Sequence, residues 1–144
     1  LAKEGHTQWN PDLIYFNNRE VKPTTGYYVQ KLYGQNAGNE YLPSKIVLDN
    51  KDDKVRKRFA SSIVRDSASG DVIVKLVNLL PAEVNTNVDL SGIGAVQPSA
   101  KRTVLTGKPT DTPLPVEDRI QIAEKFDCNL PAYSFTVIRI QKAN

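Results

Sequence analysis

The run Val72-Ile73-Val74-Lys75-Leu76-Val77 constrains the fold more than any other segment of this chain. Side chains of a β-strand alternate between the two faces of a sheet, so a strand that is apolar at nearly every position needs cover on both faces. Only Lys75 interrupts the run. The sequence therefore predicts a central strand with a packed layer on each side.

The last apolar run of the chain distinguishes its two faces. Residues 133–141 place Ser134, Thr136, Ile138 and Ile140 on one face and Tyr133, Phe135 and Val137 on the other. We expect the aromatic side, Tyr133 included, to lie in the core. Residues 83–90 also alternate between polar and apolar side chains, which predicts a strand with one face buried and one face in water.

Further segments bring the set to about seven short strands in about 100 residues, as in two-sheet sandwiches. These segments are residues 45–49, 59–65, 101–106 and 119–123. Nine prolines and eight glycines favour strands and turns over a helical bundle. We predict an all-β fold, an antiparallel jelly-roll-like β-sandwich at about residues 45–142. Its core should contain Val72, Val74, Leu76, Ile138 and Ile140.

The segment before the sandwich has a different pattern. Thr24 or Thr25 can cap a short helix over about residues 24–34, and Gly34 offers a stop. A helix of about ten residues is marginal alone. We therefore expect this helix, and the apolar run at residues 13–16, to pack onto the sandwich, to be buried against another copy, or to be poorly ordered.

The chain shows no pattern of a reaction centre. His6 is the only histidine and Cys128 the only cysteine, which leaves no basis for a catalytic triad or for a cysteine or multi-histidine metal site. The carboxylates lie in the N-terminal segment, at strand ends or on outward faces, and nothing pairs two of them on one buried surface. We assign no catalytic residue, no metal and no cofactor.

Charge gives little reason to expect nucleic acid or membrane as a partner. The net charge is +3, from 19 basic and 16 acidic residues. The densest cluster, K-D-D-K-V-R-K-R at residues 51–58, offers a phosphate-binding patch as one interpretation, but its two aspartates favour a solvated hairpin between two strands. No apolar run approaches the roughly 18 residues that cross a bilayer, and the start lacks the pattern of a signal peptide.

Five motifs along the chain share one resemblance. W-N-P-D-L-I-Y-F-N-N at residues 9–18 precedes G-Y-Y-V-Q-K-L-Y at residues 26–33. Three later motifs are V-K-L-V-N at residues 74–78, L-T-G at residues 105–107 and L-P-A-Y-S-F-T-V-I-R-I at residues 130–140. The first two resemble a signature of family 51 glycoside hydrolases, the α-L-arabinofuranosidases. The later three resemble landmarks of that family's C-terminal jelly roll.

The resemblance implies a division of the chain and a role for it. In that family a (β/α)8 barrel carries two catalytic glutamates, and the chain then continues into a β-sandwich. Residues 1–40 would be the terminal loop and helix of the barrel, and residues 41–144 the C-terminal β-sandwich domain. Both glutamates would lie upstream of Leu1. A chain that begins with Leu1 and contains no methionine is expected to be a piece of something longer.

The function implied is that of a non-catalytic C-terminal domain. Its parent would hydrolyse terminal non-reducing α-L-arabinofuranosyl residues of arabinan, arabinoxylan or related oligosaccharides by a retaining two-carboxylate mechanism, without a cofactor. The expected partners are the catalytic barrel of the same enzyme and, in the intact enzyme, an arabinofuranosyl-containing oligosaccharide. A homo-oligomer is left open, and for the parent we expect a secreted or periplasmic location.

Two residues of the N-terminal loop are candidates for contact with substrate in the intact enzyme. His6 and Trp9 would follow a barrel strand, on the face where barrel enzymes build their sites, and an indole can stack on a furanose ring. The alternatives are a polar surface histidine and a tryptophan that anchors the loop. For the whole chain, the alternative is a free-standing carbohydrate-binding module. Its sandwich has few aromatic residues to offer, and two of them are expected in the core.

Overall fold

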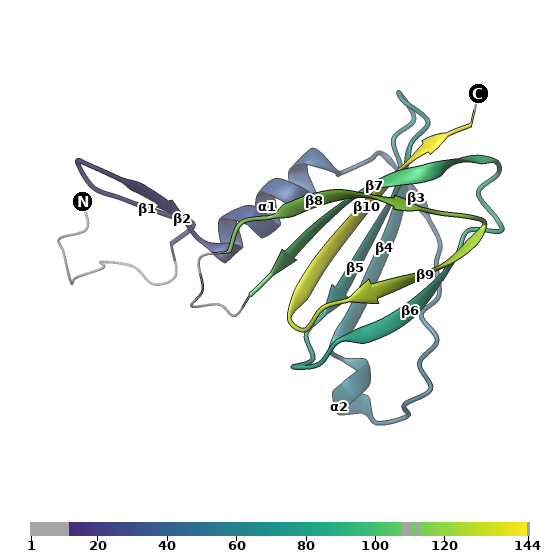
Figure 1. Cartoon of the computed structure of the whole chain (residues 1–144), viewed down its shortest axis with the longest axis horizontal. Coiled ribbons are helices and arrows are strands. Elements are labelled where there is room, and N and C mark those ends of the chain that lie inside the picture. The colour runs from purple at the N-terminus through teal and green to yellow at the C-terminus, as the bar shows by residue number, and fades with distance from the viewer. Residues whose placement is uncertain (1–11, 108–110, 112, 144) are drawn as a thin grey trace.

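The computed structural model describes residues 12–107, 111 and 113–143 (Figure 1). This part of the chain forms two helices, α1 (Thr25–Gln35) and α2 (Asp53–Arg56). The first strands are β1 (Ile14–Phe16), β2 (Val21–Pro23), β3 (Glu40–Leu42), β4 (Phe59–Arg65) and β5 (Val72–Asn78). The later strands are β6 (Val84–Asp89), β7 (Val96–Thr106), β8 (Val116–Gln121), β9 (Lys125–Leu130) and β10 (Ser134–Lys142).

The strands form one large sheet, one small sheet and a separate hairpin. The large sheet has the order β3-β4-β5-β10-β7-β8, the small sheet pairs β6 with β9, and the hairpin pairs β1 with β2. All of these pairs are antiparallel. At the centre of the large sheet, Ile138 of β10 lies opposite Val74 of β5 and Arg102 of β7.

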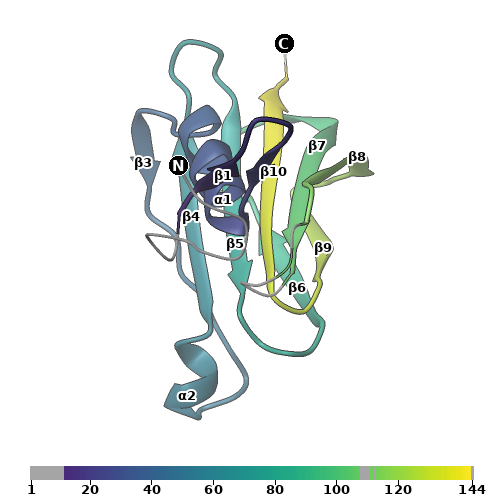
Figure 2. The same cartoon turned by 90° about the vertical axis from the view of Figure 1, so that its left-hand side faces the viewer.

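The large sheet is covered on both faces. On one face it packs against β6 and β9, and this core contains Val72, Val74, Leu76, Val88, Leu90, Phe126, Leu130, Ile138 and Ile140. On the other face α1 lies over the sheet and buries Leu32 against Ile73, Leu105, Phe135 and Val137. Figures 1 and 2 show α1 and the β6–β9 pair in these separate layers. The chain is thus an antiparallel β-sandwich, as predicted, and a helix lies on the outer face of its large sheet.

Lys75 lies on the face of the sheet that α1 covers. Only 3% of this residue is exposed, and its ammonium nitrogen lies 5.4 Å from the centre of the Tyr33 ring. Burial lowers the pKa of Lys75, because desolvation disfavours the charged form. The Tyr33 ring in turn stacks on Phe135, with the ring centres 4.8 Å apart. A cation–π contact therefore accommodates the one charged residue of the central strand.

Several predicted elements are confirmed. The predicted strand at residues 59–65 coincides with β4, and all five predicted core residues are buried. Thr24 caps α1, because its hydroxyl accepts a hydrogen bond from the Tyr27 amide. The helix continues through Gly34 to Gln35, so the predicted stop at Gly34 is one residue early. Of the outcomes expected for this helix, packing onto the sandwich is the one observed.

Other predictions about strands are wrong. Residues 45–49 are irregular, and Val47 is 75% exposed. The chain leaves the sheet edge after Leu42 at Pro43, a residue type that cannot donate a backbone hydrogen bond to a strand. The cluster at residues 51–58 is solvated, but it contains the single helical turn α2 and is not a hairpin. Strands β1, β2, β3 and β9 were not predicted.

Tyr133 is also placed differently from the prediction. It precedes β10 with a φ of 49°, which turns the backbone out of the strand conformation, and it is 36% exposed. Tyr133 therefore does not share the buried face of Phe135. Among the described residues, neither helix is long and apolar enough to cross a membrane.

The side chain of Asn78 holds one end of the sandwich together. Its amide nitrogen donates to the carbonyl oxygens of Ala82, Leu130 and Pro131 at 2.9, 3.2 and 2.9 Å, and its amide oxygen accepts from Leu80 N–H at 3.0 Å. Asn78 is fully buried. The bonds join the end of β5 to the turn between β9 and β10, which connects the two sheets.

Replacement of Asn78 by alanine should lower the free energy of unfolding by about 3 kcal/mol, because it removes the side-chain donor from the buried Leu130 carbonyl and from two part-buried carbonyl groups. Urea denaturation measures the change. The matched control is Asn87→Ala, which removes an exposed bond to Asp127 and should cost less than about 0.5 kcal/mol. Equal losses in the two variants would show that the Asn78 bonds do not hold this end.

Candidate interdomain interface

The β1–β2 hairpin exposes apolar side chains, so the run at residues 13–16 does not pack onto the sandwich as the helix does. Four of these side chains have large exposed fractions: Leu13, Ile14, Phe16 and Val21. The largest are 57% for Phe16 and 64% for Val21. The hairpin is shaped by its own turn, in which the Asn17 carboxamide oxygen accepts from the amides of Arg19 and Glu20. Figure 1 shows it extending away from the two sheets. A two-stranded hairpin with such a surface is marginal in water by itself.

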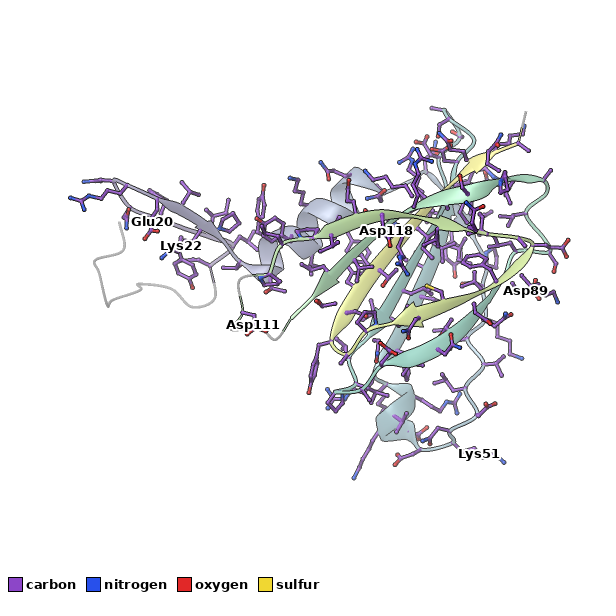
Figure 3. The ribbon with its side chains drawn as sticks, in the orientation of Figure 1. Glu20, Lys22, Lys51, Asp89, Asp111 and Asp118 are labelled. Carbon is purple, nitrogen blue, oxygen red and sulfur yellow. The ribbon has the colours of Figure 1, made fainter. Side chains whose placement is uncertain are left out.

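The start of α1 joins the hairpin to a loop of the sandwich. The amide and the hydroxyl of Thr24 both donate to the Leu13 carbonyl oxygen, each at 2.9 Å. The hydroxyl of Thr25 donates to the Asp111 carbonyl oxygen at 3.3 Å. Figure 3 shows Asp111 between the hairpin and the sheets. These bonds link the hairpin and the start of α1 to a loop 86 residues further along the chain.

The three C-terminal motifs of the sequence meet at one end of the sandwich. The Tyr133 amide donates to the Leu80 carbonyl at 3.0 Å, and the Gly107 amide donates to the Tyr133 carbonyl at 3.2 Å. A β-carbon at Gly107 would lie 3.0 Å from Pro113 Cγ, which explains the glycine of the L-T-G motif. The positive φ of Tyr133 is uncommon outside glycine and is held here by bonds on both sides.

The described carboxyl groups do not resemble the acid of a glycosidase. Four of them have shifted pKa values, and all four are shifted downward by hydrogen bonds: Asp66 by the Ala68 amide and then Arg139, Asp89 by the Ser91 hydroxyl and then Lys125, Glu117 by Lys101, and Asp118 by Arg102. A general acid needs a raised pKa. No group of three or more His, Cys, Asp or Glu suited to a metal occurs among the described residues.

A polar hollow of about 350 Å³ lies between the end of α1 and strands β7, β8 and β10. Its charged groups are already paired: Lys101 Nζ lies 2.8 Å from Glu117, and Arg139 Nε lies 2.6 Å from Asp71. A second hollow, of about 390 Å³, has one charged residue in its lining, Glu124. Neither hollow offers the two carboxylates that retaining glycoside hydrolysis requires.

The structure describes some of the residues singled out from the sequence and not others. His6 and Trp9 lie outside the described residues. Asn78 and Gly107 were quoted as parts of motifs, without a role, and Tyr133 was expected in the core. Their role is to connect turns at one end of the sandwich, and their place within motifs was the signal that they matter.

These features define a class of protein: an accessory β-sandwich domain with an exposed apolar extension and, in its described part, no reaction centre. Residues 6–136 match the family model for the α-L-arabinofuranosidase C-terminal domain. The chain belongs to this family.

Individual relatives agree with this assignment. The chain is 49% identical over 45 residues to an extracellular exo-α-L-arabinofuranosidase of Streptomyces chartreusis, which is 31% of this chain and 6% of that protein. It is 28% identical over 149 residues to α-L-arabinofuranosidase 1 of Arabidopsis thaliana, across 94% of this chain. The arabinose-bound α-L-arabinofuranosidase MgGH51 has a similar structure, with a TM-score of 0.82 and 27% identity over 97% of this chain.

The chain spans a minor part of these proteins. The match covers 21% of the Arabidopsis protein and 23% of the MgGH51 chain.

The ion pairs of Arg139 should make stability depend on pH. Hydrogen bonds from the Ala68 amide and then from Arg139 hold the folded pKa of Asp66 below its ordinary 3.8, so the stabilisation that Arg139 contributes is present above that value and is lost as the pH falls through the folded pKa. The variant Arg139→Gln should therefore lower the free energy of unfolding at pH 6, and the difference from the unaltered chain should shrink in acid. Urea denaturation at each pH measures this difference. In the control, Lys22→Gln removes an exposed ion pair with Glu20 and should change the free energy of unfolding little at any pH. A loss from Arg139→Gln that is independent of pH would contradict the assignment.

Proposed function

We propose that this chain is the non-catalytic C-terminal domain of a retaining α-L-arabinofuranosidase. The parent enzyme hydrolyses terminal non-reducing α-L-arabinofuranosyl residues of arabinan, arabinoxylan or related oligosaccharides with two carboxylates on a barrel upstream of this chain. The names of the relatives support this activity. The extracellular Streptomyces relative supports a secreted location of the parent.

The main observation in support of this function is the exposed apolar hairpin formed by β1 and β2. Its four exposed apolar side chains belong to the first described segment, and a C-terminal domain is joined to the rest of its protein at its N-terminal end. Burial of each half-exposed side chain against another domain would stabilise the enzyme by roughly 1 kcal/mol. The hairpin is therefore the part of this chain best suited to contact the barrel.

The proposed division places residues 1–40 at the end of the barrel and residues 41–144 in the sandwich domain. Under this division α1 belongs to the barrel by sequence but packs on the sandwich through Leu32. Helix α1 would therefore connect the barrel to the sandwich domain. His6 and Trp9 remain the proposed contacts to arabinofuranosyl substrate in the intact enzyme.

The chain should not hydrolyse 4-nitrophenyl α-L-arabinofuranoside, because both catalytic carboxylates are assigned to the missing barrel. Release of nitrophenol, measured at high protein concentration, checks this. Activity that copurifies with the chain and disappears in Glu4→Gln or Asp12→Asn would overturn the proposal.

Hydrogen exchange should separate the hairpin from the helix. Amides of β1 and β2 should exchange rapidly in this chain and slowly in the intact enzyme, where the barrel covers them. Amides at residues 29–35 of α1 should be protected in both, because the sandwich already covers this helix. Equally rapid exchange of the hairpin in both proteins would show that it does not contact the barrel.

A further inference from the structure

The chain's net charge is concentrated in one segment, residues 43–58, which we call the basic lobe. The lobe contains six basic residues, Lys45, Lys51, Lys54, Arg56, Lys57 and Arg58, and three acidic residues, Asp49, Asp52 and Asp53. Its net charge of +3 equals that of the whole chain. Of the chain's 19 basic and 16 acidic residues, the remaining 13 of each sign balance. The net charge of the chain is therefore the net charge of the basic lobe.

The fold keeps the basic lobe apart from the proposed barrel contact. The lobe connects β3 to β4, and Figure 1 shows α2 below the sheets, while the β1–β2 hairpin extends to the left. Figure 2 shows α2 projecting at the bottom of the molecule, and Figure 3 shows Lys51 there. The lobe would therefore remain accessible when the barrel covers the hairpin.

The basic side chains of the lobe are free to bind a partner. All nine of its charged residues are exposed, and within the described part of the chain none of them forms an ion pair. One of its carboxylates is used locally, because Asp52 accepts a hydrogen bond from the Lys54 amide at 2.8 Å and caps α2. The cations have no such local role.

The spacing of three cations favours a ligand with repeated charges. Lys54 lies in α2, and Lys57 and Arg58 directly follow its last residue, so the three cations fall within five consecutive positions of the chain. Several like charges close together attract a chain of anions more strongly than a single ion. The lobe has no Phe, Tyr or Trp, the residues on which unpaired nucleic-acid bases stack.

We propose that the basic lobe binds a carboxylated polysaccharide, one that carries uronate groups along its backbone. The choice of a polysaccharide over other polyanions rests on the proposed function, whereas the location of the binding site rests on the charge of the lobe. Binding there would hold the enzyme on an acidic polymer while its barrel acts on neutral arabinofuranosyl groups. The lobe supplies electrostatic attraction, which weakens as salt is added.

Polygalacturonate is the probe, and neutral linear arabinan is the control polymer. The chain should bind polygalacturonate at low ionic strength, as measured by biolayer interferometry, and should not bind arabinan. The variant Lys54→Glu/Lys57→Glu/Arg58→Glu should weaken binding on the order of tenfold or more. The control variant Lys31→Glu/Arg119→Glu/Lys142→Glu has the same charge change at exposed residues elsewhere and should weaken binding by less than about threefold.

Three results would overturn the proposal: no binding by the unaltered chain, equal losses in the two triple variants, or tighter binding to duplex DNA than to polygalacturonate. Equal losses would mean that binding follows net charge alone. Unfolding of each variant in urea checks that it is folded. Failure of the proposed function appears elsewhere, in hydrolysis by the chain or in an unprotected hairpin in the intact enzyme, so the two failures are distinguishable.

Discussion

Strands β5 and β10 are apolar on both faces, and the remaining layers follow from the need to cover them. Ile73 and Val137 point to one side, Val74 and Ile138 to the other, and all four are buried. Helix α1 covers the first side and the β6–β9 pair the second. A two-sheet sandwich without α1 would leave one apolar face of the large sheet in water. The third layer, although it is only one short helix, is therefore needed for the stability of the domain.

Sequence reasoning identified the elements whose patterns are local. The central strand, β4 and the cap of α1 follow from apolar runs and from one threonine. Strand β9 was missed although Lys125, Asp127 and Asn129 alternate with its three inward residues, which is the same pattern that identified residues 83–90. The strand at residues 45–49 was wrong because an apolar run needs a partner strand, and after Pro43 the chain has left the sheet.

The contacts that join the turns at one end of the sandwich could be predicted only in part from the sequence. The motifs marked Asn78 and Tyr133, but Asn78 bonds to a carbonyl 52 residues away, and such a contact exists only in the folded chain. The left-handed backbone of Tyr133 depends on bonds to Leu80 and Gly107 in the same way. The charges of the basic lobe were evident in the sequence. Their separation from the rest of the surface required the fold.

The position of α1 also bears on where this chain could be joined to another domain. Under the proposed division the helix would end the barrel, yet its buried side chain, Leu32, packs on the sandwich. A chimera that joins a foreign barrel after residue 35 would remove the cover from Ile73 and Phe135. A junction placed before Asp12 keeps the helix with the sheet that it covers. The unit suited to transplantation is thus larger than the sandwich alone and includes the preceding helix and hairpin.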